Sequence, residues 1–446
     1  MGAHELGVFD DIAEAIDAAY EAQRTLMLEY TTMDRDRMIA KIKEKCMEVI
    51  EADTIAEFEE TGYGRLPEKL VKNIASIQFA EDTSSLQPKV FASGAGLTVE
   101  YEAPVGLVGA LTPVTNGFVT VASNAMMMLA AGNSIVFNAH PDGKTAAAKA
   151  VQLVNSAVIE AGGPENLATM VKIPDMDTLQ VIMDSPKVEL LIGTGGEFMV
   201  DTLMRSNKKV IAAGPGNVPV VIDETADIPL AAKTLYENIP FENNMLCITE
   251  KEAFVVDAVF DRFMEEIEKN GARILTQEEA DKVTATALAK TPAGKYKPKK
   301  EYVAHDANFI LESSGVAPSE GDLMLAVFEA EYEQPFVECE QLMPIFPVVR
   351  CRDVKEAMEL AIRAEAGCRH SAAIWSKDID RITDFARRIG TTCFVANGAT
   401  VAATGMGGTG KGSSTIATFT GEGFTTASSF TRVRRFALAG GSGYTA

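Results

Sequence analysis

Between Gly106 and about residue 222, the chain alternates short apolar runs with stretches of helical periodicity. The runs VGLVGALTP, NSIVFNAHP and VELLIGTGG have the length of buried strands and end in glycine or proline. Between them, SNAMMMLAAG and KTAAAKAVQLVNSAVIEAG predict helices that end at glycines. Strands joined by helices of this length form right-handed crossovers, so we expect an α/β fold with a mostly parallel sheet.

The flanking segments extend this pattern. Apolar residues at helical spacing from Val8 to about Gly62 predict two or three amphipathic helices, and residues 96–103 (GLTVEYEA) alternate like a strand. We expect a second α/β unit from about Ile228 to Thr415, followed by strand-like sequence that becomes rich in glycine and serine. A chain of 446 residues can hold two or three domains.

The charge balance is acidic, with 41 basic and 63 acidic residues. This disfavours nucleic acid or an anionic membrane surface as a partner, and the longest apolar stretch is too short to span a bilayer. The six cysteines form no CxxC pair and the four histidines are scattered. We therefore expect no metal site, no disulfide framework and a cytoplasmic location.

The segment FENNMLCITEK, residues 241–251, is the most informative one for chemistry. A lone cysteine in apolar sequence is usually an inert core residue. Here Glu242, Asn243 and Asn244 precede Cys247, and a strand-like run follows, which suits a loop that presents a thiol at the edge of a sheet. Backbone N–H groups of such a loop could stabilise both a thiolate and a developing oxyanion.

FENNMLC resembles the catalytic loop of the aldehyde dehydrogenase superfamily. Three more segments match that superfamily in order along the chain: LTPVTN (111–116), LIGTGGE (191–197) and ECEQLMP (338–344). RHSAAIWS (369–376) and TGEGFTTASSFTRVRR (420–435) resemble in particular the CoA-acylating propionaldehyde and acetaldehyde dehydrogenases of bacterial microcompartments. The matches run from about residue 8 to 436, so the resemblance covers nearly the whole chain.

The resemblance implies the aldehyde dehydrogenase fold. It assigns residues 1–88 and 104–225 to a Rossmann-like dinucleotide-binding domain and residues 226–415 to an α/β catalytic domain. Residues 89–103 and 416–446 become oligomerisation strands and a tail. Strands with exposed edges need covering, so we expect a homodimer or a homotetramer.

The resemblance also implies roles for individual residues. Cys247 is the nucleophile, and the Asn116 side chain is the second oxyanion donor beside the Cys247 backbone N–H. Glu340 holds the nicotinamide ribose, although a solvated carboxylate is the alternative. His140 and Pro141 shape an adenosine pocket, or else form an ordinary strand-terminating turn. The residues expected to bind the cofactor are Thr112, Pro113, Asn138, His140, Pro141, Thr194, Gly195, Gly196, Ala213, Gly214, Glu340 and Pro344.

The acyl acceptor is inferred from a missing carboxylate. Hydrolytic relatives carry a water-activating Glu where this chain has Ala213, in AAGPGN (212–217). We therefore expect oxidation of a short-chain aldehyde, of the propionaldehyde or acetaldehyde type, to its acyl-CoA with NAD. Asn138 stands where many relatives have an adenosine-binding Lys, which leaves NADP open. The alternatives are a hydrolytic or acyl-phosphate-reducing relative, or a non-catalytic nucleotide-binding scaffold of the same fold.

Two further segments bear on function. GMGGTGKGSS, residues 405–414, nearly matches a phosphate-binding P-loop, but Gly412 replaces the required Ser or Thr and the sequence after it predicts a strand. The final GGSGYTA resembles a linker with nothing attached. Acylating relatives are often packaged in microcompartments by a short targeting helix, so shell proteins are further expected partners.

Overall fold

The computed structural model describes residues 5–409 and 412–440. The chain divides into two compact units. The first unit comprises Met1–Thr61, Leu70–Ala213 and Gly412–Ala446, and the second comprises Gly62–Lys69 and Gly214–Lys411. Each unit is built around its own parallel sheet.

The first unit contains a six-stranded sheet in the order β1-β6-β5-β4-β7-β8, and every neighbouring pair is parallel. Its strands are β1 (Val8–Phe9), β4 (Leu107–Thr112), β5 (Ser134–Ala139), β6 (Ala168–Val171), β7 (Val188–Thr194) and β8 (Lys209–Ala213). Successive crossovers run outward in one direction from β4 to β6 and in the other from β7 to β8. The direction reverses between β4 and β7, which is where open α/β sheets bind ligands.

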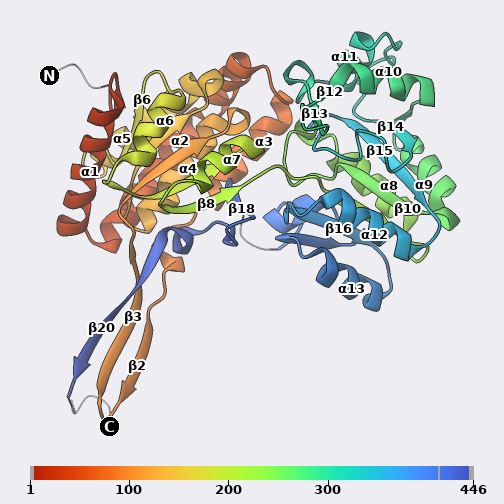
Figure 1. Cartoon of the computed structure of the whole chain (residues 1–446). Helices are drawn as coiled ribbons and strands as arrows, with labels where there is room; N and C mark the ends of the chain where they lie inside the picture. Colours follow the sequence, from red (N-terminus) through yellow and green to blue (C-terminus); the bar gives the residue numbers. More distant parts are fainter. Residues whose placement is uncertain (1–4, 410–411, 441–446) are drawn as a thin grey trace. The chain divides into compact units, whose positions relative to one another are not determined.

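Helices cover both faces of this sheet (Figure 1). One face packs against α2 (Thr32–Thr61), α4 (Gly117–Ala130) and α5 (Lys144–Glu160), and the other against α1 (Ile12–Glu29), α6 (Met176–Asp184) and α7 (Glu197–Met204). Every residue of α4 is buried, which explains its almost wholly apolar sequence.

Two carboxylates of α2 accept hydrogen bonds from the amino-terminal N–H groups of neighbouring helices. Glu57 accepts a hydrogen bond from the Phe118 N–H (3.0 Å) in the first turn of α4. Glu60 accepts from the N–H groups of Thr145 and Ala146 (2.8 and 2.9 Å) in α5. A negative charge at a helix amino terminus satisfies free N–H groups and favours the helix dipole.

The second unit contains a seven-stranded parallel sheet in the order β11-β14-β15-β10-β9-β16-β17. Its strands are β9 (Pro219–Ile222), β10 (Glu252–Val256), β11 (Arg273–Ile274), β14 (Ala326–Ala330), β15 (Ile345–Cys351), β16 (Ser371–Trp375) and β17 (Cys393–Ala396). Its helices are α8 (Ile228–Asn238) and α9 (Asp257–Lys269) on one face, and α10 (Gln277–Ala287), α11 (Ala307–Ser313), α12 (Val354–Glu365) and α13 (Ile379–Ile389) on the other.

A narrow three-stranded antiparallel sheet extends from the first unit (Figure 1). It comprises β2 (Lys89–Ser93), β3 (Gly96–Pro104) and β20 (Thr431–Ala439). All of β2 and most of β20 are exposed, including the apolar side chains of Phe91, Val433 and Phe436. The edge of β2 is unpaired within the described chain, which is the condition under which strands recruit another chain.

The alternation of strands and helices confirms the expected parallel architecture, with three differences. The expected boundary after residue 225 lies too late, because β9 pairs with β10 and β16 and so belongs to the second sheet. The helix α3 (Leu66–Phe79) was not expected. The strand expected directly after the Gly-rich loop is short, since β18 covers only Ile416–Ala417 and pairs with β19 (Gly423–Phe424).

Two of the P-loop-like residues, at positions 410 and 411, lie outside the described residues, as does most of the final GGSGYTA. Within the described chain, no helix combines the length and the hydropathy needed to cross a membrane.

Candidate active site

The second unit gathers its chemically informative residues at one edge of its sheet. Gly216 precedes β9, Cys247 and Lys251 precede β10, Glu340 precedes β15, and His370 directly precedes β16. Because all these strands are parallel, the loops that precede them meet at the amino edge of the sheet. The topology thus brings together residues that lie more than a hundred positions apart in sequence.

A strained turn leads into the cysteine loop. Glu242, Asn243 and Asn244 have φ values of 52°, 55° and 62°, so three consecutive residues are left-handed. Asparagine tolerates this conformation best among residues with a β-carbon, and both amides are anchored here. Asn243 Nδ2 donates to Ala304 O and Asp306 Oδ1 (both 3.0 Å).

The other two residues of the turn are anchored as well. Asn244 Nδ2 donates to Ile239 O (2.9 Å) and Glu250 O (3.0 Å). Glu242 lies 3.3 Å from Lys69 Nζ, and both side chains are fully buried. Strain that the surroundings enforce in this way is common at functional sites, because it holds a loop in one shape.

The thiol of Cys247 is half-buried. Burial raises its pKa to about 12, and the Glu340 carboxylate acts in the same direction. The Lys251 ammonium and the N–H groups of Cys247 and Ile248 lower the pKa. The resting group is therefore a thiol at neutral pH, set among donors that favour its ionised form. Among the other cysteines, Cys46, Cys339, Cys351 and Cys393 are buried and Cys368 is partly exposed.

Gly216 lies between Cys247 and His370. A β-carbon at this position would lie 2.4 Å from Cys247 O and 2.9 Å from His370 Cγ, distances that no side chain could occupy. The Gly216 N–H donates to Glu340 Oε1 (2.9 Å). Only glycine fits here, because the Cys247 carbonyl and the His370 ring lie so close to its backbone. Gly216 thus contacts the cysteine loop, His370 and Glu340.

His370 was not assigned a role from the sequence, although the RHSAAIWS match contains it. Its ring is fully buried, with Nδ1 2.9 Å from Ser371 Oγ. Nε2 is buried and has no hydrogen-bond partner among the described residues. Burial, together with the Lys251 charge, lowers the pKa of His370 to about 3, so the ring is neutral at physiological pH.

The first unit places most of the expected cofactor-binding residues at the carboxyl edge of its sheet. Thr112 ends β4 and Pro113 follows it, while Thr194 ends β7 and Gly195 follows it, so these two pairs flank the point where the strand order reverses. The remaining members of this edge are Asn138, His140 and Pro141 at the end of β5, Gly196 at the start of α7, and Ala213 at the end of β8.

This edge fits a dinucleotide in two respects. Thr112 Oγ1 is buried at the end of β4 and has no hydrogen-bond partner in the described chain. A β-carbon on Gly195 or Gly196 would meet nothing within 4 Å, so a ligand can approach the backbone at the amino terminus of α7. Helix amino termini of this kind favour phosphate groups.

Asn138 is committed to a structural contact. Its Oδ1 accepts from Thr178 Oγ1 (2.8 Å) and its Nδ2 donates to Asp175 O (3.2 Å), which braces the start of α6. His140 Nδ1 accepts from the Asp142 N–H (3.2 Å), as a turn after a strand would require. These contacts account for both residues without a ligand, so their cofactor roles stay proposals.

Asn116 stands directly before α4 and is held by a lysine. The Lys72 Nζ donates a short hydrogen bond to Asn116 Oδ1. Since an ammonium can only donate, this contact fixes which end of the amide is the oxygen. Asn116 Nδ2 donates no hydrogen bond to any described residue, so both of its N–H groups remain available.

Gly214 and Pro344 are two expected cofactor residues in the second unit whose surroundings do not themselves suggest a ligand. Gly214 is buried and begins the second unit. Pro344 precedes β15, where its carbonyl accepts from the Ala326 N–H (3.1 Å) and so extends the strand pairing. Their assignment as cofactor residues rests on the sequence resemblance alone.

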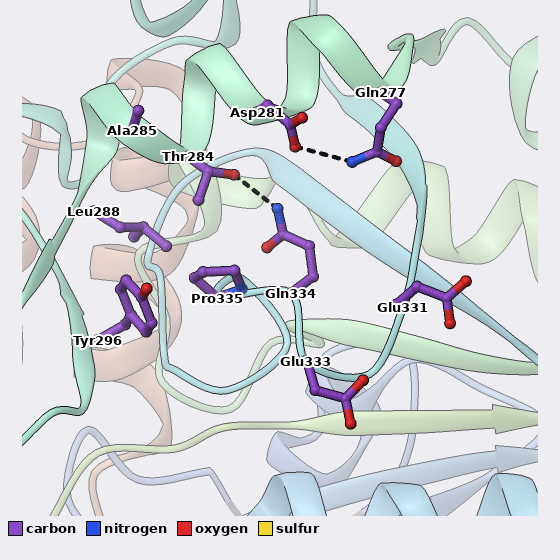
Figure 2. A pocket seen from close by; sticks show the side chains of 10 residues that line it. All are labelled: Gln277, Asp281, Thr284, Ala285, Leu288, Tyr296, Glu331, Glu333, Gln334 and Pro335. Carbon is purple, nitrogen blue, oxygen red and sulfur yellow. Dashed lines mark hydrogen bonds between the residues drawn. The ribbon is translucent and has the colours of Figure 1, made fainter.

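A separate hollow lies between α10 and the loop of residues 331–335 (Figure 2). Gln334 Nε2 donates to Thr284 Oγ1 (2.7 Å) across it, and Asp281, Glu331 and Glu333 give it an acidic rim. No cysteine, histidine or lysine lines it. It therefore offers no thiol, imidazole or amine, and the amino edge of the sheet remains the candidate active site.

The first unit has a switch-point edge suited to a dinucleotide, and the second unit has a cysteine in a strained loop; these two features point to a dehydrogenase. The chain belongs to the aldehyde dehydrogenase family, whose profile matches residues 4–434. The expected fold is confirmed by this match and by the solved structures.

Three proteins illustrate the similarity. The acetylating acetaldehyde dehydrogenase EutE of Salmonella typhimurium is 40% identical, over 98% of this chain and 93% of its own length. A propionaldehyde dehydrogenase from the fucose utilisation microcompartment of Clostridium phytofermentans is 38% identical, with a TM-score of 0.93 over 97% of this chain and 98% of its own. The propionaldehyde dehydrogenase of Rhodopseudomonas palustris, solved with bound CoA and an acylated cysteine, is 36% identical with the same TM-score and coverage.

Proposed function

We propose that this protein oxidises a short-chain aldehyde to its acyl-CoA, with NAD as hydride acceptor and Cys247 as nucleophile. The observation that carries the proposal is the cysteine loop, where the Lys251 ammonium and backbone N–H groups favour the thiolate. Position 213 is an alanine, so no carboxylate stands there to activate water. The names of the similar proteins support the same reaction class, since they include acetylating and propionaldehyde dehydrogenases.

The first step is the addition of the Cys247 thiolate to the aldehyde carbonyl, which forms a carbon–sulfur bond and an alkoxide. The Cys247 N–H favours negative charge beside the sulfur and is the first donor to that alkoxide. Asn116 is proposed as the second donor. This role rests on the sequence resemblance, and it is supported by the orientation that Lys72 imposes on the amide.

The second step removes a hydride from the former aldehyde carbon and leaves an acyl thioester on Cys247. A bound oxidised nicotinamide dinucleotide supplies the acceptor for this hydride. Thr112, Pro113, Thr194, Gly195 and Gly196 are proposed to hold the dinucleotide, with Glu340 on its ribose. Because Asn138 offers no cation for a 2′-phosphate, we propose NAD as the preferred form.

The third step transfers the acyl group to CoA. The thiol of CoA ionises far more readily than water, and its sulfur attacks the thioester carbonyl as the Cys247 sulfur leaves. Water needs a general base to compete, and Ala213 cannot provide one. His370 stays neutral beside the loop and adds no positive charge of its own there.

We further propose a homodimer or homotetramer joined through β2, β3 and β20. The exposed apolar side chains and the unpaired edge of β2 support this assembly. A location with microcompartment shell proteins is proposed by analogy with the Clostridium phytofermentans protein. Light scattering on the purified chain tests the assembly, since a monomer at micromolar concentration would contradict it.

The experiment that tests the reaction is an NADH assay with propionaldehyde, NAD and CoA. Cys247→Ala should abolish NADH formation, whereas Cys351→Ala, which changes a buried cysteine inside β15, should leave it within about twofold. Omitting CoA should stop turnover. Phosphate or water supporting turnover equally well would instead favour the acyl-phosphate or hydrolytic alternative.

A further inference from the structure

A fully buried lysine follows Cys247 by four residues. Lys251 has no exposed surface, which is rare for lysine unless its ammonium is fully paired. Its Nζ donates to the carbonyl oxygens of Leu246 (2.9 Å) and Thr249 (2.9 Å), with Asn244 O at 3.5 Å. All three acceptors belong to the cysteine loop. The ammonium therefore contacts the backbone on both sides of Cys247.

The contact with Leu246 determines the direction of a catalytic donor. The Leu246 carbonyl and the Cys247 N–H belong to one trans peptide unit, in which they point in opposite directions. Because Leu246 O is turned toward Lys251, the Cys247 N–H is turned away from it. That N–H acts on the Cys247 sulfur, whose ionised form it favours. Through its hydrogen bond to Leu246 O, Lys251 thus fixes the direction of the Cys247 N–H, which is the proposed oxyanion donor.

A second hydrogen bond closes the loop on the same carbonyl. The Thr249 N–H donates to Leu246 O (3.1 Å), so Leu246 O accepts from two donors at once. The loop from Leu246 to Thr249 is therefore a compact turn whose carbonyls converge on a single ammonium. Without that ammonium, the Leu246 and Thr249 carbonyls would be buried with fewer donors, which favours rotation of their peptides.

Titratable groups surround Lys251 from several elements. Glu250 and Glu252 flank it in sequence, Glu340 faces it from the segment before β15, and the Cys247 thiol and the His370 ring complete the set. Burial lowers the pKa of Lys251 to about 8, and the carboxylates and the thiol act against that fall. The lysine is therefore an ammonium with three donors at neutral pH.

We propose that Lys251 is a positioning residue that orients the Leu246–Cys247 peptide, so that its N–H faces the sulfur and the oxygen of the bound aldehyde. The proposal rests on the proposed role of Cys247 as nucleophile. It adds that the same ammonium favours the thiolate through its charge, without touching the substrate. Lys251 and Cys247 then act as one unit, with the lysine setting the geometry that the cysteine uses.

The test compares Lys251→Met with Glu252→Gln. Methionine keeps the apolar stem and removes the donors and the charge. Glu252 is the neighbouring, equally buried residue, and burial raises its pKa well above the ordinary value, so glutamine closely mimics its neutral form. Glu252 makes no hydrogen bond to the cysteine loop. The first readout is the rate at which iodoacetamide alkylates Cys247 between pH 6 and 10, measured by mass spectrometry of the peptide.

Lys251→Met should slow alkylation at pH 8 by about tenfold, as expected for a rise of one unit in the thiol pKa. Its kcat should fall by about a hundredfold, the usual effect of losing one oxyanion donor, with a much smaller change in the KM for aldehyde. Glu252→Gln should match the wild type in both. A folded Lys251→Met protein with the wild-type alkylation profile and kcat would overturn the proposal.

If Lys251→Met does not fold, hydrogen exchange of the wild-type protein gives the answer. Raising the pH from 7 to 9.5 removes the ammonium charge, so protection of the amides from residue 246 to 249 should fall relative to that of β10. Equal protection at both pH values would overturn the proposal. Alkylation and exchange require no aldehyde oxidation, so they remain decisive even if the proposed reaction is wrong.

Discussion

Gly216 approaches the carbonyl of Cys247 so closely that a β-carbon at position 216 would lie 2.4 Å from that oxygen. The same atom would lie 2.9 Å from the His370 ring. The backbone before β9 and the cysteine loop before β10 are therefore packed as one body, and the position of the nucleophile depends on the absence of a side chain.

This packing predicts the effect of Gly216→Ala. The added methyl must push the cysteine loop or His370 aside, so we expect a loss of about 1–3 kcal/mol in the free energy of unfolding, which is typical of overpacking. We also expect a fall in kcat of at least about tenfold, because small displacements of a nucleophile are costly. Gly94→Ala is the matched control, since a β-carbon there meets nothing within 4 Å. Chemical denaturation and NADH formation measure both effects, and a Gly216→Ala protein with wild-type kcat would contradict the packing argument.

The contact between Lys72 and Asn116 predicts a non-additive pair. Asn116→Ala should lower kcat by about 10²–10³, the range for one oxyanion donor. Lys72→Met should lower it less, because the amide can still reach its productive orientation part of the time. The double variant should be no slower than Asn116→Ala, since without the amide the lysine has nothing to orient. Additive losses in kcat would show that Lys72 acts independently of Asn116.

Replacing Glu340 should make Cys247 more reactive but weaken the binding of NAD. Its negative charge raises the pKa of Cys247, so Glu340→Gln should lower that pKa and speed alkylation of Cys247 at pH 8, by about threefold for half a pKa unit. Glutamine can still accept from the Gly216 N–H, so the loop should keep its shape. If Glu340 holds the ribose, the same change should raise the KM for NAD. Slower alkylation in the variant would refute the electrostatic argument.

His370 predicts a dependence of stability on pH. Its pKa is lowered from 6.5 to about 3 in the folded protein, so below pH 6.5 the unfolded chain binds a proton that the folded chain does not. Stability from this group is thus complete above pH 6.5 and is lost as the pH falls toward 3, at about 1.4 kcal/mol per pH unit. The difference in unfolding free energy between wild type and His370→Asn should therefore shrink as the solution is acidified. Parallel curves from pH 7 to 4 would exclude a buried neutral imidazole.

The parallel architecture could be predicted from sequence because long periodic segments specify it, as the buried helix α4 and the strand β5 illustrate. The boundary at residue 225 failed for a physical reason. The run VPVVID is equally apolar in either sheet, and only its pairing with β10 and β16 assigns it to the second unit.

The candidate site could be predicted only where a motif was present. Cys247 and Asn116 were found through the FENNMLC and LTPVTN segments. Lys251 was missed because a lysine after a strand-like loop looks like an ordinary surface charge, and its burial depends on where the chain folds. Gly216 and His370 were missed as partners because 154 positions separate them, and only the parallel order of β9 and β16 brings them together.

If Cys247 is the nucleophile, it holds the acyl group until CoA removes it. The direct measurement mixes the protein with NAD and propionaldehyde, without CoA, and follows both NADH and the mass of the Cys247 peptide. We expect a burst of about one NADH per chain and a propionyl group on that peptide, which CoA then releases as propionyl-CoA. Continuous NADH formation in the absence of CoA, at the rate seen with CoA, would contradict this expectation.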